Sequence, residues 1–436
     1  MSGFSRVNGH LTVDGLSLND LANEFGTPLY VYSAAAITDA YHHFRDAVSG
    51  ADSHIHFALK ANSNLAVLKL LANLGAGADI VSGGEMERAL AAGIAPENII
   101  FSGVGKTDAE LLAAMSIGIG QINAESPAEV DAIIRLATSH HHQCRVALRV
   151  NPNVDAKTHA KIATGKSDTK FGISMDECPG LYRRMAESGV ITPAGLAVHI
   201  GSQIMTLEPF ENAWHNLVDL AEDLRQSGLD VPGLDLGGGL GVDYATGQPA
   251  EVAAFGALVT RLFGNRKFSL GFEPGRWITA EAGALLTQVI YTKDAPSKQF
   301  VIVDGAMNDL IRPTLYEAYH RIEPVADHGA MAKKADIVGP VCETGDYLGL
   351  DRDMPELSTG DLLAVMSAGA YGAVMRSSYN TRPPAAEVLV IDGEAHLVSP
   401  RQSVADLLAL DTIPACLLYT SPSPRDLSTS RMPSSA

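Results

Sequence analysis

The sequence predicts an α/β protein made of a (β/α)8 barrel followed by a smaller β-rich domain. Eight short apolar runs recur through about 250 residues, each followed by a helix-like segment, and the unusual polar residues fall at the ends of these runs. An open doubly wound sheet usually has fewer parallel strands, so eight units favour the barrel. After about residue 280 strand-like runs follow one another without amphipathic helices, which predicts the second domain.

The predicted barrel strands are short runs rich in valine, isoleucine and leucine. They cover residues 55–60, 77–82, 98–103, 121–126, 145–151, 195–202, 233–240 and 268–275. Three helix starts carry the capping-box pattern, in which a Ser or Thr side chain and a Glu three residues later accept backbone N–H groups of the first turn. These pairs are Ser82 with Glu85, Thr107 with Glu110, and Ser126 with Glu129.

The chain divides into four predicted parts. Residues 1–30 have no place in the barrel and are expected to pack against the β-rich domain, whereas 31–280 form the barrel and 281–414 form that domain. Asp392-Gly393 is a dipeptide preferred in two-residue hairpin turns and separates two predicted strands. Residues 415–436 are rich in Ser and Pro, and we expect them to be disordered and not native to the gene.

Charge and cysteine content narrow the range of functions. The 436 residues include 50 acidic and 32 basic side chains, a formal net charge of −18 that disfavours nucleic acid and anionic membranes as partners. The four cysteines have no C-x-x-C pair, which indicates reduced thiols and no zinc site. No signal peptide or bilayer-spanning run is present in the sequence. We therefore expect a cytoplasmic protein that needs no metal.

Several polar features lie at or just beyond the carboxyl ends of predicted strands, the face where barrel enzymes carry their active sites. They are Lys60, Asp79, His199, the glycines at 237–239 and the segment from Glu273 to Arg276. Taken alone, Lys60 could be a rim charge that reaches water, His199 a core histidine and Glu273 a surface charge. Their common position at one end of the barrel predicts an active site.

The glycine run 237–241 has two interpretations. It lacks the third glycine of a dinucleotide fingerprint and the Lys-Ser/Thr pair of a P-loop, so it could be only a tight turn. Glycines also expose backbone amides that can bind phosphate, and phosphate sites are frequent in the seventh and eighth units of barrels, where this run and Gly275-Arg276 lie. A lysine, a phosphate site and an acidic strand end together suggest pyridoxal 5′-phosphate as cofactor.

Six motifs occur in the order typical of one enzyme family. They are FALKAN with Lys60, HIGSQ with His199, GGGLG with Gly239, EPGR with Glu273 to Arg276, VCETGD with Cys342 and Glu343, and GAYG with Tyr371. Through them the chain resembles the diaminopimelate decarboxylases, which are fold-type III pyridoxal phosphate-dependent decarboxylases with an alanine racemase-like architecture. The resemblance extends from about residue 10 to residue 412. It implies decarboxylation of meso-2,6-diaminopimelate to L-lysine and CO2, the last step of lysine biosynthesis.

The resemblance also implies how the cofactor is bound. Lys60 would form a Schiff base with it, and apolar neighbours would favour the neutral, nucleophilic amine. His199 would stack on the cofactor ring, Glu273 would keep the pyridine nitrogen protonated, and Asp79 would lie nearby. The remaining cofactor-binding positions are Gly238, Gly239, Gly275, Arg276 and Tyr371.

On the substrate side, Arg276 and Arg312 have planar guanidinium groups suited to carboxylates. The resemblance implies that these arginines bind the distal carboxylate of the substrate, with Tyr316 and Tyr371 as further substrate-binding residues. Glu343 would bind the distal ammonium group. A pocket of both signs suits a zwitterionic end better than the plain amine of ornithine or the guanidinium of arginine.

The resemblance further implies a homodimer with shared active sites, in which Cys342 reaches the barrel of the other subunit and acts as the proton donor. A free cysteine is otherwise more often a small buried hydrophobic residue. Two alternatives stay open. One is an ornithine- or arginine-type decarboxylase of the same fold, although ornithine-type relatives typically have Asp where this chain has Glu343. The other is a non-catalytic regulatory homologue, which would be expected to have lost Lys60 or Cys342.

Overall fold

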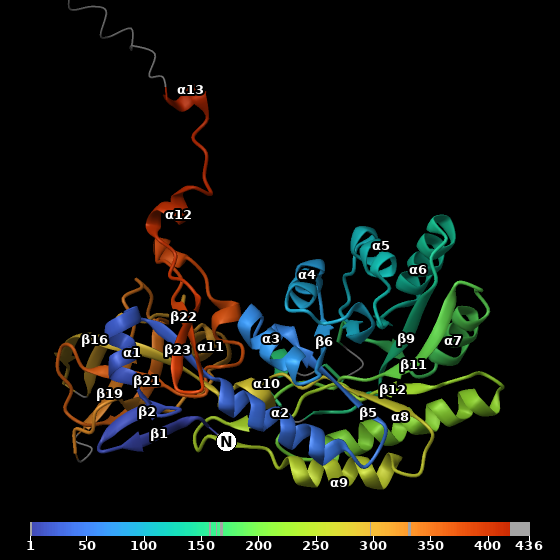
Figure 1. Ribbon diagram of the computed structural model, residues 1–436, viewed down its shortest axis with the longest axis horizontal. Helices are drawn as coiled ribbons and strands as arrows, with labels where there is room; N and C mark the ends of the chain where they lie inside the picture. The colour runs from blue at the N-terminus through green and yellow to red at the C-terminus, as the bar shows by residue number, and fades with distance from the viewer. Residues whose placement is uncertain are drawn as a thin grey trace, which may run out of the picture.

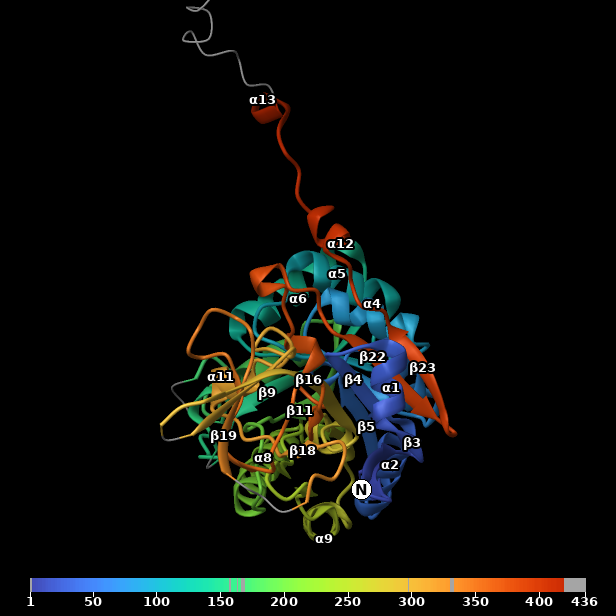
Figure 2. The same ribbon diagram turned by 90° about the vertical axis from the view of Figure 1, so that its left-hand side faces the viewer.

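The computed structural model describes residues 2–156, 158–162, 164–165, 169–296, 298–329 and 333–418. A barrel and a β-rich domain lie side by side, and the C-terminal segment extends away from both (Figures 1 and 2). This arrangement confirms the predicted fold class.

The barrel consists of eight parallel strands, all at the predicted places. They are β5 (Ser53–Ala58), β6 (Gly77–Ile80), β7 (Ile99–Phe101), β8 (Gln121–Ala124), β9 (Cys144–Asn151), β11 (Ile191–Ala197), β12 (Gly233–Asp235) and β15 (Ser269–Phe272). β15 pairs with β5, which closes the barrel, and the two-residue β10 (Ile173–Ser174) pairs with the end of β9. The carboxyl ends of all eight strands therefore point to one face.

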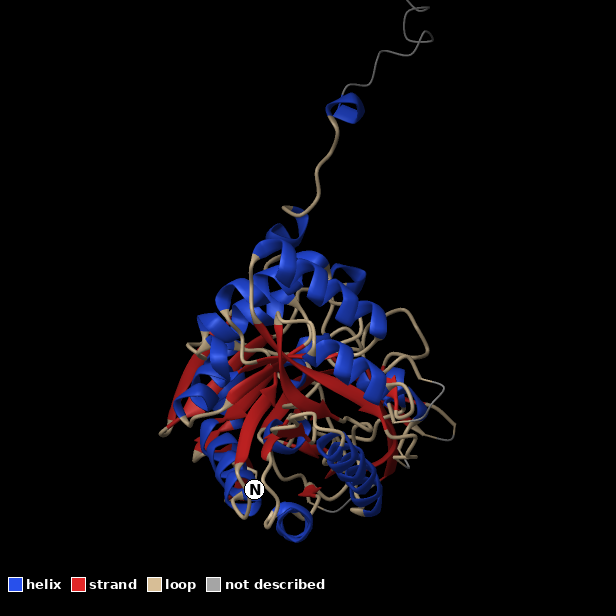
Figure 3. Ribbon diagram, turned by 90° about the vertical axis from the view of Figure 1, so that its right-hand side faces the viewer, coloured by secondary structure: helices blue, strands red, loops and turns tan. Residues whose placement is uncertain are grey.

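Seven helices follow the first seven strands on the outside of the barrel (Figure 3). They are α3 (Leu65–Asn73), α4 (Gly83–Ala91), α5 (Asp108–Ile117), α6 (Pro127–His140), α7 (Cys178–Ala186), α8 (Glu208–Gln226) and α9 (Val252–Phe263). The eighth strand is followed only by the short α10 (Arg276–Thr279). The gap is covered by α2 (Ala34–Val48), which contacts α3, α9 and α10. Its Phe44 packs against Phe255 and Phe272, with ring centroids 5.8 and 6.0 Å apart.

All three predicted capping hydroxyls are present, but only one of the three helix starts forms the full capping box. Thr107 and Glu110 form the full reciprocal capping box at the start of α5. Ser82 accepts the backbone N–H of Glu85, but the Glu85 carboxylate accepts from Val81, one residue before the cap. The start of α6 follows the same pattern as that of α4. The capping hydroxyl was therefore predictable, and the return bond of the glutamate less so.

The β-rich domain is built around a mixed sheet. Its strands are β4 (Leu29–Ser33), β16 (Gly283–Asp294), β17 (Gln299–Val303), β18 (Ile322–Pro324), β19 (Lys333–Val338), β20 (Tyr347–Met354), β21 (Leu362–Val365), β22 (Ala386–Ile391) and β23 (Glu394–Ser399). Asp392 and Gly393 have φ angles of 51° and 79° and join β22 to β23 in the predicted hairpin. β4 runs between β16 and β22, so a strand that precedes the barrel in sequence belongs to this domain.

The N-terminal segment forms β1 (Phe4–Val7), β2 (His10–Val13), β3 (Leu16–Ser17) and α1 (Leu18–Phe25). Its Leu11 and Leu21 belong to one buried apolar cluster with Leu286 and Val388 of the β-rich sheet. Burial of these side chains holds the segment on that domain.

At the other end, α12 (Val404–Leu408) is followed by α13 (Ala415–Leu418), a short helix at the start of the segment predicted to be disordered. Residues 419–436 lie outside the described part of the chain. Among the described residues, none of the helices is long and apolar enough to cross a membrane.

Candidate active site

Lys60 lies in η1 (Leu59–Ala61), a single 3-10 turn that follows β5 and places the side chain at the carboxyl end of the barrel. Its ammonium group donates a hydrogen bond to the buried carboxylate of Asp79 in β6. Burial lowers the pKa of Lys60, but the carboxylates of Asp79 and Glu273 raise it more, and the net shift is upward. The expectation of a neutral amine among apolar neighbours is therefore wrong for this arrangement, because two carboxylates outweigh the effect of burial.

A second acidic group, the buried Glu273, interacts electrostatically with Lys60. Glu273 follows β15, and its carboxyl group is hydrogen-bonded to that of Asp235 at the end of β12. Ser102 donates to Glu273 across 3.3 Å, and Asn123 donates to Asp235 across 2.9 Å. Burial and the neighbouring carboxylates raise the pKa of Glu273 well above its usual value. Two carboxyl groups can share a hydrogen bond only if one is protonated, so this pair holds a proton next to Lys60.

His199 stands just after β11, where its ring meets the glycine loop. Its Nδ1 accepts the backbone N–H of Gly238 across 3.2 Å, so the ring proton sits on Nε2. Burial lowers the pKa of His199 well below its usual value, and the charges of Arg149 and Lys60 lower it further. The imidazole is therefore neutral and fixed in orientation. The Gly238 amide, predicted to bind the cofactor, is engaged by this ring.

The three central glycines of the loop are required by space. A Cβ on Gly237, whose φ is 68°, would lie 2.3 Å from the Val198 carbonyl oxygen, and one on Gly239 would lie 2.5 Å from that of Gly201. A Cβ on Gly238 would lie 2.1 Å from a backbone oxygen as well. The loop can thus pack its backbone against the end of β11 only because side chains are absent.

Gly275 is crowded in the same way. A Cβ on this residue would lie 2.9 Å from the Ala61 Cβ, so the EPGR segment touches the turn that carries Lys60. Tyr371 reaches the same turn from the β-rich domain, since its backbone N–H donates to the Ala61 carbonyl across 2.8 Å. Its φ of 55° is uncommon for a residue with a side chain. The contact brings the two domains together at the mouth of the barrel.

Two buried arginines, Arg276 and Arg312, both contact Tyr244. Arg276 begins α10 and donates to the Ser202 hydroxyl across 3.0 Å and to the Tyr244 hydroxyl. Arg312 begins α11 (Arg312–Tyr316), and its guanidinium carbon lies 4.6 Å from the centre of the Tyr244 ring. Burial lowers the pKa of Arg312, as does the charge of Arg276. Among the described residues neither arginine forms an ion pair with a carboxylate, so both are suited to bind an anion that enters from outside.

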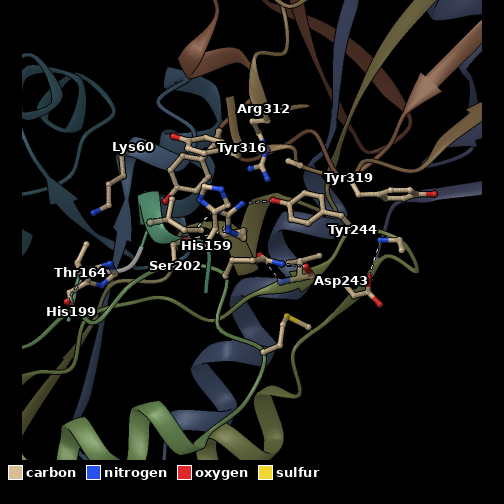
Figure 4. Close-up of a pocket in the computed structure, with 18 residues that line it drawn as sticks. Lys60, His159, Thr164, His199, Ser202, Asp243, Tyr244, Arg312, Tyr316 and Tyr319 are labelled. Carbon is tan, nitrogen blue, oxygen red and sulfur yellow. Dashed lines mark hydrogen bonds between the residues drawn. The ribbon is translucent and has the colours of Figure 1, made fainter. Parts of the chain in front are cut away.

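These groups surround one cavity of about 620 Å³, shown in Figure 4. Its walls include six predicted residues, Lys60, His199, Arg276, Arg312, Tyr316 and Tyr371. Sequence reasoning missed other wall residues, notably His159, Ser202, Tyr244 and Tyr319. Tyr244 lies between β13 (Val242–Asp243) and β14 (Gln248–Pro249), a small hairpin without a sequence pattern of its own. Its position in the run that follows GGGLG was the one available signal.

Cys342 and Glu343 are not brought to this cavity by their own chain. They lie on the loop between β19 and β20, and both are exposed. Glu343 accepts a hydrogen bond from the Tyr379 hydroxyl, itself at the surface. The two residues therefore belong to an outer face of the subunit.

The cavity fits pyridoxal 5′-phosphate. Its wall offers an amine at Lys60 and, among the described residues, two arginines without carboxylate partners. The buried acid Glu273 interacts with Lys60, and the tight glycine loop contacts His199. Asp79 Oδ1 is buried and has no hydrogen-bond partner in the described part of the chain, so this carboxylate has spare capacity towards a positive group. Lysine, acid and anion site on a (β/α)8 barrel with a β-rich domain define the class of pyridoxal phosphate-dependent enzymes.

Comparisons with known proteins specify the family within that class. Residues 34–280 match the family model described as pyridoxal-dependent decarboxylase, pyridoxal binding domain. The diaminopimelate decarboxylase of Zymomonas mobilis is 48% identical over 413 residues, which cover 94% of this chain and 98% of that protein. The chain belongs to the pyridoxal-dependent decarboxylase family, and pyridoxal 5′-phosphate is its cofactor.

Solved structures agree with this assignment. The diaminopimelate decarboxylase of Helicobacter pylori complexed with L-lysine is 40% identical with a TM-score of 0.87, covering 90% of this chain and 98% of that one. The corresponding enzyme of M. jannaschii, also with L-lysine, is 34% identical with a TM-score of 0.90, covering 96% and 100%.

Proposed function

We propose that the protein decarboxylates meso-2,6-diaminopimelate to L-lysine and CO2, the last step of lysine biosynthesis. The observation that carries the proposal is the pair of buried arginines, Arg276 and Arg312, that face the Lys60 cavity without a carboxylate partner among the described residues. A substrate with a second carboxylate supplies that partner, whereas ornithine and arginine do not. The names of the relatives support the same substrate.

The barrel residues have distinct roles towards the cofactor. When bound, pyridoxal 5′-phosphate supplies an electron sink for the electron pair that a departing carboxylate leaves behind. Lys60 provides the amine that binds the cofactor aldehyde, and Asp79 orients this amine. Glu273 would face the pyridine nitrogen of the bound cofactor and keep it protonated, and the neutral His199 would contact the cofactor ring. Gly239, Gly275, Arg276 and Tyr371 would bind the cofactor phosphate, and Gly238 is a further cofactor-binding position whose amide donates to His199.

The distal end of the substrate is bound through both of its charged groups. Arg276 and Arg312, with Tyr316 and Tyr371 on the same cavity, hold the distal carboxylate and keep the molecule oriented. Glu343 takes the distal ammonium group, and the Cys342 thiol delivers a proton to the carbon that has lost CO2. The positive arginines and the negative Glu343 together select a distal group that carries both charges.

Because Cys342 and Glu343 are exposed on their own chain, we propose that they complete the site of a second copy in a homodimer with two shared active sites. Two-fold symmetry makes both sites alike. We also propose that the enzyme works in the cytoplasm.

The function is tested by substrate preference. The purified protein with its cofactor is given meso-diaminopimelate, L-ornithine or L-arginine, and CO2 release is measured. We expect kcat/KM for diaminopimelate to exceed the other two by at least about a hundredfold, because they leave buried arginines unpaired. Faster turnover of ornithine or arginine would contradict the substrate assignment, and no release from any of them would favour a non-catalytic role.

A further inference from the structure

His320 lies behind Arg312 and does not itself line the cavity, but it contacts two residues that do, Arg312 and Tyr244. It stands between α11 and β18, and its side chain is fully buried. The Nδ1 atom lies 2.9 Å from the Met366 carbonyl oxygen, and Nε2 accepts a hydrogen bond from Arg312 Nε across 3.3 Å. Tyr244 packs edge-on against the imidazole, with ring centroids 4.9 Å apart. His320 thus holds Arg312 by a hydrogen bond from within the protein interior.

The two contacts determine the protonation of His320. A carbonyl oxygen accepts only, so Nδ1 carries a proton, and Arg312 Nε donates only, so Nε2 carries a lone pair. Burial lowers the pKa of His320 to about 3, and the Arg312 charge contributes in the same direction. The ring is therefore neutral, with one end anchored to the backbone and the other accepting from the arginine.

This support limits how Arg312 can be placed. Nε donates to His320, and the guanidinium carbon lies 4.6 Å from the centre of the Tyr244 ring. The Tyr244 hydroxyl accepts from Arg276, so one tyrosine separates the two positive groups. Within the described part of the chain the four Nη N–H groups of Arg312 have no hydrogen-bond partner, so they are available to a ligand.

We propose that His320 is a positioning residue that sets specificity for a substrate with a second carboxylate, by holding Arg312 as a preorganised fork. The inference rests on the proposed function, since it concerns the site assigned to the distal carboxylate. Preorganisation reduces the conformational entropy that Arg312 loses when it binds a ligand. Without His320, Arg312 would therefore bind the carboxylate more weakly.

A pair of variants separates the two ends of the imidazole. His320→Asn keeps a donor near the Nδ1 position for Met366 but loses the acceptor for Arg312, whereas His320→Gln places an amide oxygen near the Nε2 position. We expect His320→Asn to raise KM for meso-diaminopimelate by about tenfold with kcat changed less than about threefold, and His320→Gln to stay near wild type. Equal effects of the two variants, or an unchanged KM in His320→Asn, would overturn the inference.

Competitive inhibitors show whether the lost affinity belongs to the carboxylate. L-Lysine retains the distal carboxylate, and cadaverine has the same two amines without it. His320→Asn should raise Ki for L-lysine by about tenfold and leave Ki for cadaverine unchanged. A parallel rise for both inhibitors would mean a general structural defect and would overturn the proposal. His56→Asn is the matched control, because it removes a second histidine whose pKa burial lowers, at the opposite end of the barrel.

A double variant tests whether His320 acts through Arg312. Arg312→Met alone should raise KM by at least about thirtyfold, because a buried carboxylate loses a charged partner. Adding His320→Asn to Arg312→Met should cause no further rise in KM. If the effects of the two substitutions on KM multiplied, the inference would be overturned. If the wild-type enzyme failed to release CO2 from meso-diaminopimelate, the proposed function itself would fall and this inference with it. If the wild-type enzyme is active and His320→Asn leaves KM unchanged, only this inference is overturned and the proposed function stands.

Discussion

The barrel and the β-rich domain contribute to the site in different ways. Barrel residues such as Lys60, Asp79 and Glu273 are packed around a buried hydrogen-bonded cluster within one chain. The β-rich domain places Arg312 in that cavity, yet it carries Cys342 on an exposed loop. The difference supports the proposal that one subunit supplies the cofactor-binding residues and that Cys342, the proposed proton donor, serves the site of a second subunit. Variants on each side should therefore fail in different ways.

Lys60→Ala should have the largest effect, because it removes the amine proposed to bind the cofactor in the barrel. Turnover should fall by at least about a thousandfold, and the visible absorbance that appears when wild-type protein binds the cofactor should be lost. The melting temperature should change little. Lys69→Ala on the exposed side of α3 is the matched control and should behave as wild type. Substantial turnover in Lys60→Ala would place the cofactor amine elsewhere.

Cys342→Ala should leave cofactor binding in the barrel intact but slow the reaction. We expect cofactor absorbance to be unchanged and kcat to fall by about a hundredfold or more, since a positioned acid contributes that much to proton transfer. KM should change less, because the thiol acts after CO2 has left. Cys416→Ala, at another exposed cysteine, should leave kcat unaltered. A full kcat in Cys342→Ala would remove this residue from the mechanism.

The smallest effect should come from the C-terminal segment. The described side chains of α13 are exposed and make few packing contacts, so we expect the protein to tolerate removal of residues 415–436. Melting temperature and turnover should both equal those of the full chain, as measured side by side. A lower value of either would show that the segment packs on the body of the protein.

The sequence predicted the barrel well because its signals are local. Alternating apolar runs and helix caps lie within a few residues of each other, and all eight strands were found. Three strands of the β-rich domain, β18, β19 and β20, were not predicted. β18 has only three residues, and β19 and β20 each carry several charged residues. Lys60 could be singled out from its place at a strand end, but its pairing with Asp79 depends on contact across two strands.

Parts of the site that depend on distant contacts could not be predicted. Tyr244 reaches Arg312 from a hairpin 68 residues earlier in the chain, and Asp235 meets Glu273 only when β12 and β15 pair. A pattern search finds residues by type and spacing, whereas these partners are defined by the closed barrel. The exposed position of Cys342 on its own chain is likewise visible only in three dimensions.

The central claim is that each active site takes Lys60 from one subunit and Cys342 from the other, and refolding of two inactive variants tests it directly. Lys60→Ala and Cys342→Ala proteins are unfolded together in equal amounts, refolded with cofactor, and assayed for CO2 release. Random pairing makes about half of the dimers mixed, and each mixed dimer has one intact site, so activity should recover to about a quarter of wild type. Each variant refolded alone is the control. If the mixture stays at the level of the single variants, both residues act within one chain and the shared site is wrong.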